Sequence, residues 1–121
     1  MSVKTKIVKN RLPNLTGAVR RSAVRVINET AEEVLEIARQ LAPEDTGELK
    51  RSGHLENQND TVKMVVFDAE YALPVEEGHH TVNGDWVPPQ AFLRPAHESV
   101  KGRLNRRLGQ IAAGLAKDIG K

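Results

Sequence analysis

The sequence predicts an α+β domain with a long N-terminal helix, a small antiparallel sheet with an extended loop or hairpin, and a C-terminal helix. Apolar residues recur at three- and four-residue steps over residues 12–41 and again over residues 100–119, which is the period of an amphipathic helix. Between these stretches, residues 61–67 (TVKMVVF) are mostly β-branched and apolar, a composition typical of a strand. Helices that cover one face of a small antiparallel sheet form an α+β fold.

The composition indicates one domain with a modest core. The chain has 121 residues, enough for one hydrophobic core and too few for two. Aromatic residues make up 3% of the chain, so the core must consist mainly of Val, Leu, Ile and Ala. We therefore expect part of the apolar surface to be buried against another subunit. The absence of cysteine excludes a disulfide framework and a thiolate zinc site.

Charge is unevenly distributed, although the net charge is only +2. Residues 1–28 carry seven bases and no acid, residues 29–93 carry fourteen acids and four bases, and residues 94–121 carry seven bases and two acids. The basic ends are expected to meet the acidic middle of the same chain or of a neighbouring copy, unless they are solvated helix faces. No apolar run approaches the roughly 18–20 residues of a membrane span, and the N-terminus has no secretory signal, so we expect no membrane partner.

The first elements follow from local chemistry. Residues 1–11 alternate Lys with apolar residues and carry no helix cap, so we expect a flexible basic arm there and a single α+β domain over residues 12–121. The long helix should stop near Leu41, because Pro43 cannot donate a backbone hydrogen bond and disfavours helical geometry in the residue before it.

A turn is predicted directly after this helix, at Asp45-Thr46-Gly47. Asp and Thr side chains cap nearby backbone amides, and Gly tolerates a positive φ. The same triplet occurs in aspartic proteases, which need two carboxylates sharing a proton, each on a loop that follows a hydrophobic strand. Here the triplet follows a helix and Ala42-Pro43-Glu44, so a capped turn is expected and a catalytic loop is not.

The middle of the chain predicts two hairpins. Residues 49–57 and 61–67 read as the strands of an antiparallel pair, and residues 71–78 as an apolar turn that ends at a glycine. Residues 79–91 form a long loop, in which Asn83-Gly84 predicts the tip of a second small hairpin.

A second helix is predicted after this loop. Pro95 occupies the first-turn position that proline favours. The apolar stripe of this helix faces away from a basic side that carries Lys101, Arg103, Arg106, Arg107 and Lys117.

Chemically capable side chains are present but form no recognisable catalytic or metal-binding pattern. The histidines and nearby acids are His54, Asp68, His79, His80, Asp85 and His97. Adjacent histidines in a strand point to opposite faces, and no histidine pair has the helical spacing that zinc favours, so we expect surface histidines. Glu76-Glu77 is expected to be a solvated rim and not an acid/base pair. Glycines are scattered singly, and no serine has His and Asp at motif spacing. We expect no enzyme, no cofactor and no metal.

Three sequence blocks follow one another in a fixed order along the chain. The first is an AP-x-DTG-x-L-x-x-S pattern, the second a YA-x-x-VE-x-G pattern, and the third a proline-phenylalanine-leucine-proline-alanine pattern. Their most informative residues are Pro43, Asp45, Thr46, Gly47, Leu49, Ser52, Tyr71, Glu76, Gly78, Phe92, Leu93 and Pro95. Together the three blocks resemble the gene-product-ten-like tail-component family of lambdoid and other long-tailed bacteriophages.

The resemblance implies a structural role and no catalytic residues. It implies a virion protein of the phage neck that completes or caps the tail and joins it to the head. Members of the family are small α+β subunits that act in rings, often sixfold, beside other neck and tail proteins. The implied location is the neck or tail of the virion, assembled in the cytoplasm of the bacterial host.

Two surfaces are expected to make contacts with partners. One is the long loop, because its apolar residues Val82, Trp86 and Val87 have little reason to lie there unless a partner covers them. The other is the basic face of the last helix, at Arg103, Arg106 and Arg107.

Two alternatives remain open from the sequence. A non-specific nucleic-acid-binding protein would use the basic last helix against phosphates, although the acidic middle and the scarcity of aromatic residues argue against it. A small hydrolase would use the carboxylates of Asp45 or Glu76.

Overall fold

The computed structural model describes residues 3–7, 17–43, 47–59 and 61–119, with side chains described as far as Ile111. It confirms the α+β fold, with a long helix in the N-terminal part of the chain, a small antiparallel sheet and a long C-terminal helix. The elements are β1 (Val3–Lys6), α1 (Gly17–Leu41), α2 (Glu48–Arg51), β2 (Gly53–Asn59), β3 (Val62–Phe67), α3 (Ala72–Glu77), β4 (His79–His80), β5 (Trp86–Val87) and α4 (Leu93–Ile119).

The main sheet has the order β1-β3-β2, and both pairings are antiparallel. The predicted hairpin is confirmed, and Phe67 lies opposite Gly53 in β2 and opposite Val3 in β1. The expectation that strand structure begins at Leu49 is wrong, because the short helix α2 occupies this stretch and buries Leu49 in the core.

The expectation of a flexible arm over residues 1–11 is wrong for Val3–Lys6, which form the edge strand β1. The side chains of Val3 and Ile7 are buried, and the Ile7 amide donates to the Lys63 carbonyl at 2.9 Å. Alternation of Lys with apolar residues is the strand pattern of a half-buried edge, so the lysines face outward while Val3 joins the core. The rest of the arm lies outside the described residues.

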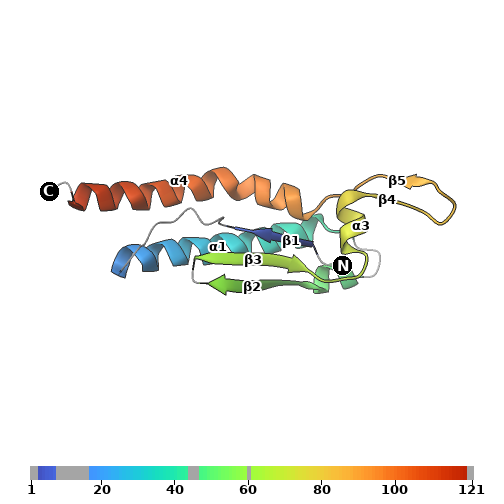
Figure 1. Ribbon diagram of the computed structural model, residues 1–121, viewed down its shortest axis with the longest axis horizontal. Coiled ribbons are helices and arrows are strands. Elements are labelled where there is room, and N and C mark those ends of the chain that lie inside the picture. The colour runs from blue at the N-terminus through green and yellow to red at the C-terminus, as the bar shows by residue number, and fades with distance from the viewer. Residues whose placement is uncertain (1–2, 8–16, 44–46, 60, 120–121) are drawn as a thin grey trace.

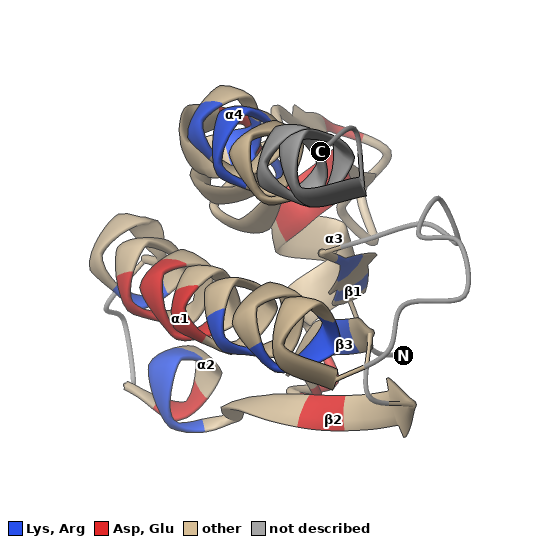
Figure 2. Cartoon of the chain, turned by 90° about the vertical axis from the view of Figure 1, so that its left-hand side faces the viewer, with Lys and Arg blue, Asp and Glu red and all other residues tan. Residues whose placement is uncertain are grey.

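Helices α1 and α4 lie side by side and run in opposite directions (Figures 1 and 2). Helix α1 packs against β2 and β3, and α4 packs against α1 and the edge strand β1. Helix α1 ends at Leu41, as Pro43 predicts. The apolar stripe of α4 is confirmed as far as it is described, since Val100 and Leu104 are buried and Leu108 and Ile111 pack against the core.

The core lies between the two helices and the sheet. Its aromatic centre is a T-shaped contact between Phe67 of β3 and Phe92, just before α4, with ring centroids 4.9 Å apart. Such a pair contributes about 0.5–1.5 kcal/mol beyond the burial of its area. The largest fully buried side chains are Phe67, Phe92, Ile27, Leu49, Leu93, Val34, Val65, Val66 and Val100.

Gly53 is required where α1, β2 and β3 approach closely. A Cβ at this position would lie 2.7 Å from the Phe67 ring and 2.9 Å from Leu35 Cδ1. Both neighbours are buried, so neither has free space into which to move.

Gly53→Ala should therefore lower the free energy of unfolding by about 1–3 kcal/mol, the usual cost of overpacking a core. Urea unfolding followed by circular dichroism measures this. The matched control is Gly102→Ala in α4, where a Cβ meets nothing within 4 Å. This control should raise stability by about 0.5–1 kcal/mol, because Ala is the better helix former. A Gly53→Ala protein as stable as the wild type would contradict the packing described.

Candidate functional site

A buried carboxylate joins α3 to the beginning of α4. The side chain of Glu76 is 6% exposed. Its Oε2 accepts from the Phe92 amide at 3.1 Å, and its Oε1 accepts from the amides of Leu93 and Arg94 at 2.9 and 3.1 Å. The first amides of a helix have no partner within the helix and lie at the positive end of its dipole. We call these three hydrogen bonds the Glu76 clamp.

The expectation that Glu76-Glu77 forms a solvated rim is wrong for Glu76 and holds for the exposed Glu77. Burying a carboxylate that has no hydrogen-bond partner costs a prohibitive amount of free energy. Glu76 accepts three hydrogen bonds from backbone amides, and these compensate that cost. Sequence reasoning missed this role because sixteen residues separate Glu76 from the first amide that it binds.

The first resemblance block shapes the passage from α1 to the sheet. Gly47 has a φ of 72° and precedes α2, as expected of its turn position. Leu49 is buried, and the Ser52 hydroxyl donates to the Leu49 carbonyl at 2.8 Å. Pro43 is half-buried after the end of α1, while Asp45 and Thr46 lie outside the described residues.

The second and third blocks meet at the Glu76 clamp. Tyr71 precedes α3 and packs against the core. Phe92 and Leu93 are buried, and Pro95 is exposed in the first turn of α4. These residues hold the ends of the segment that contains β4 and β5. Among them, Glu76, Phe92 and Leu93 form hydrogen bonds that join the two ends of that segment.

Strands β4 and β5 form the small hairpin that Asn83-Gly84 predicts. Figure 1 shows this hairpin projecting from one end of the molecule, away from the main sheet and the two long helices. Its tip is closed by hydrogen bonds from the Thr81 amide to the Asp85 carbonyl at 2.8 Å and from the Gly84 amide to the Thr81 carbonyl at 2.9 Å. Gly84 has a φ of 87°, which glycine adopts readily.

The hairpin exposes apolar side chains. Val82 at the tip is fully exposed and Trp86 is 53% exposed, while Val87 is half-buried. The Trp86 ring does not enter the main core but lies against the hairpin base and the His80 ring, whose centroid is 5.0 Å away. A Cβ on Gly78 would come within 2.7 Å of the Trp86 ring, and φ at Gly78 is 82°, so only glycine suits this position.

Two of the three arginines expected at an interface bind acids of their own chain. Arg103 of α4 forms an ion pair with Glu33 of α1, and Arg107 pairs with Glu29 at 2.8 Å. The basic end of the chain thus meets the acidic middle within one subunit. Arg106 is exposed, and its contact with a partner stays a prediction.

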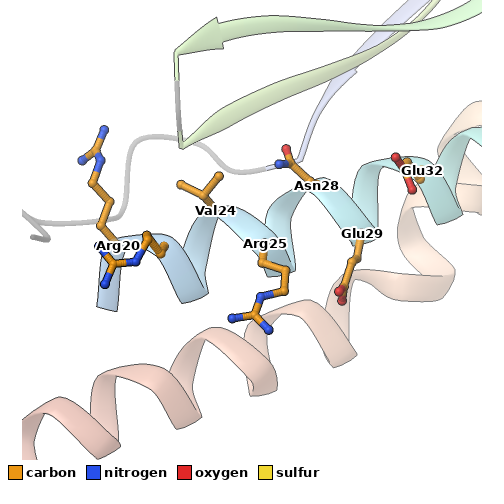
Figure 3. Close-up of a pocket in the computed structure, with 7 residues that line it drawn as sticks. Arg20, Val24, Arg25, Asn28, Glu29 and Glu32 are labelled. Atoms are coloured by element: carbon orange, nitrogen blue, oxygen red, sulfur yellow. The ribbon is translucent and has the colours of Figure 1, made fainter. Parts of the chain in front are cut away.

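A groove with a volume of about 610 Å³ runs along α1. In Figure 3, Arg25 and Glu29 point toward α4, whereas Val24 and Asn28 point to the opposite side of the helix. These side chains do not converge on one point, as the polar groups of a small-molecule site do. The described lining residues are Arg20, Arg21, Val24, Arg25, Asn28, Glu29 and Glu32, and include no nucleophile.

A histidine and two acids meet at the end of the sheet nearest α2. His54 Nε2 lies 2.9 Å from Glu56 Oε2 and 3.5 Å from Asp68 Oδ2. The hydrogen bond with Glu56 raises the pKa of His54 above its ordinary value of 6.5, and the Ser52 carbonyl and the Asp68 carboxylate act in the same direction. Sequence reasoning considered His54 and Asp68 with the other histidines but not Glu56.

Comparison of the chain with protein-family models, curated proteins and solved structures found no match. In the part of the chain that the structure describes, no helix is both long and apolar enough to cross a membrane.

Glu76→Gln should lower the free energy of unfolding by about 1–3 kcal/mol, since it replaces one acceptor by an NH₂ group that faces backbone donors. Glu77→Gln is the matched control, because Glu77 is the exposed neighbour, and it should change stability by less than about 0.5 kcal/mol. Urea unfolding of both variants tests the difference. Equal stabilities would mean that the Glu76 clamp contributes nothing.

Proposed function

We propose that this protein is a structural subunit of a bacteriophage neck. It completes or caps the tail and joins it to the head as one copy in a ring, sixfold as in the family that the sequence resembles. Its place is the virion, assembled in the bacterial cytoplasm, and its partners are further copies and other neck and tail proteins. The observation that carries the proposal is the projecting hairpin β4–β5, whose base consists of residues from two of the resemblance blocks.

The hairpin has the properties of a docking element. Val82 and Trp86 are exposed apolar side chains on a segment that packs little against its own domain. Tryptophan is enriched among the few residues that dominate interface energy. The hairpin base is fixed by the Glu76 clamp and by a hydrogen bond from the Gln90 amide to the Val75 carbonyl at 2.8 Å. Such a base presents the apolar tip in a defined direction, which lowers the entropic cost of docking.

The geometry of Glu76 favours a structural role for this carboxylate over its use in the hydrolase alternative. A catalytic carboxylate must reach a substrate proton, whereas both Glu76 oxygens accept backbone amides and the side chain is buried. The nucleic-acid alternative loses support because Arg103 and Arg107 are paired with acids of α1, which reduces the positive charge that the face offers to phosphates.

Trp86→Ala tests the proposal. Because Trp86 lies outside the main core, the variant should melt within a few degrees of the wild type. It should lose ring assembly, since truncating an interface hot spot costs about 2 kcal/mol or more, roughly a thirtyfold loss of affinity per contact. Sedimentation and electron microscopy of the full chain measure assembly against the 13.4 kDa subunit. Addition of the protein to tails assembled without it measures joining to heads.

Leu41→Ala is the matched control, because Leu41 is an exposed apolar residue that lies outside the hairpin. It should assemble and join like the wild type. A Trp86→Ala protein that assembles normally would contradict the docking role. A strongly destabilised Trp86→Ala protein would identify Trp86 as part of the core.

A further inference from the structure

Strand pairing brings three metal-ligating side chains together on one face of the main sheet. His54 and Glu56 are two residues apart in β2, so their side chains point to the same face. Asp68 directly follows β3, whose Val66 lies opposite His54. One ligand atom from each of the three residues lies within 4.8 Å of the others. This cluster is separate from the hairpin and from the Glu76 clamp, and nothing in the proposed function requires it.

The hydrogen bonds of His54 decide which ring nitrogen faces the acids. Nδ1 lies 3.0 Å from the Ser52 carbonyl, and a carbonyl only accepts, so Nδ1 carries the hydrogen. In the neutral ring, Nε2 therefore presents its lone pair to the carboxylates of Glu56 and Asp68. Three electron-pair donors then face one another, an arrangement that becomes favourable when either a proton on Nε2 or a metal ion lies between them.

The two separations from His54 to the carboxylates suit a metal ion. In a tetrahedral site with bonds of about 2.0–2.1 Å, neighbouring ligand atoms are about 3.3 Å apart. The separations from His54 Nε2 to the two carboxylate oxygens, 2.9 and 3.5 Å, fall on either side of this value. The Nδ1–H bond to a backbone carbonyl is the usual outer-shell partner that fixes a metal-binding imidazole.

We propose that His54, Glu56 and Asp68 bind a divalent transition-metal ion of the Zn²⁺ class. An imidazole with two carboxylates suits such an ion better than Ca²⁺ or Mg²⁺, which prefer oxygen ligands alone. One neutral imidazole and two carboxylates also balance the charge of a divalent ion. The side chains are 40%, 45% and 51% exposed, which leaves an open side for water or a ligand from another molecule. The bound ion would connect β2 to the segment that follows β3.

A proton on Nε2 is the competing occupant, because an imidazolium also satisfies both carboxylates. The proton and the metal ion require the same nitrogen, so they exclude each other. A direct metal titration at pH 7.5 distinguishes a binding site from an ion pair that takes up only protons.

The experiment is isothermal titration of the full chain with ZnCl₂, compared among the wild type and His54→Ala, Glu56→Gln and Asp68→Asn. The wild type should bind one Zn²⁺ per chain, and each variant should lose affinity at least about tenfold. His80→Ala is the matched control, because it removes an exposed histidine on the hairpin, and it should bind like the wild type. Circular dichroism without metal checks that every variant is folded.

A second measurement reports the atom that binds. In ¹H–¹⁵N spectra of the histidine rings, Zn²⁺ should shift the Nε2 signal of His54 while Nδ1 keeps its hydrogen. Three results would each overturn the proposal. These are the absence of Zn²⁺ binding by the wild type, binding that the three variants leave unchanged, and binding that His80→Ala removes as fully as His54→Ala does.

Discussion

The fold depends on one buried carboxylate at the beginning of a helix. Glu76 supplies acceptors for three amides that α4 cannot satisfy itself, and these donors in turn make the burial of a charge tolerable. The hydrogen bonds fix where α4 begins, and so they place Phe92 against Phe67 in the core. They also close the chain from residue 76 to residue 92 into a loop with a fixed base. The hairpin β4–β5 is the part of this loop that projects.

If the proposed function is correct, this arrangement separates stability from contact with partners. Burial in the core involves α1, α4 and the main sheet, and the charges of Arg103 and Arg107 are matched by acids on α1. The hairpin contributes little to that core and carries Val82 and Trp86 into solvent. A subunit that must join others benefits from such a division, because a docking residue on the hairpin can change without unfolding the domain. The side chains that line the groove along α1 do not converge on one point, so this groove is a weaker candidate for a binding site.

The sequence was sufficient to predict those elements whose structure follows from residues that are close together in the chain. Pro43 determines where α1 ends, the β-branched run in residues 61–67 determines β3, and Asn83-Gly84 determines the tip of the small hairpin. It was insufficient to predict elements whose structure depends on residues far apart in the chain. Strand β1 exists because β3, about sixty positions later, offers it an edge.

The candidate sites show the same limit. Glu76 is buried because the chain returns sixteen residues later to present three amides. His54, Glu56 and Asp68 meet only through the register of β2 and β3, which no local spacing reveals. The resemblance blocks include Glu76, Gly78 and Phe92. They did not indicate that these three residues lie together at the base of the hairpin.

Hydrogen exchange of the backbone amides in residues 79–87 tests the central claim most directly, when the free subunit and the assembled protein are compared. The hairpin has few hydrogen bonds and is largely exposed, so its amides should exchange rapidly in the free subunit. Assembly should protect these amides, while those of β3 remain protected in both states. Hairpin amides that exchange equally fast in the two states, with new protection elsewhere on the surface, would contradict the claim that the hairpin is the docking element.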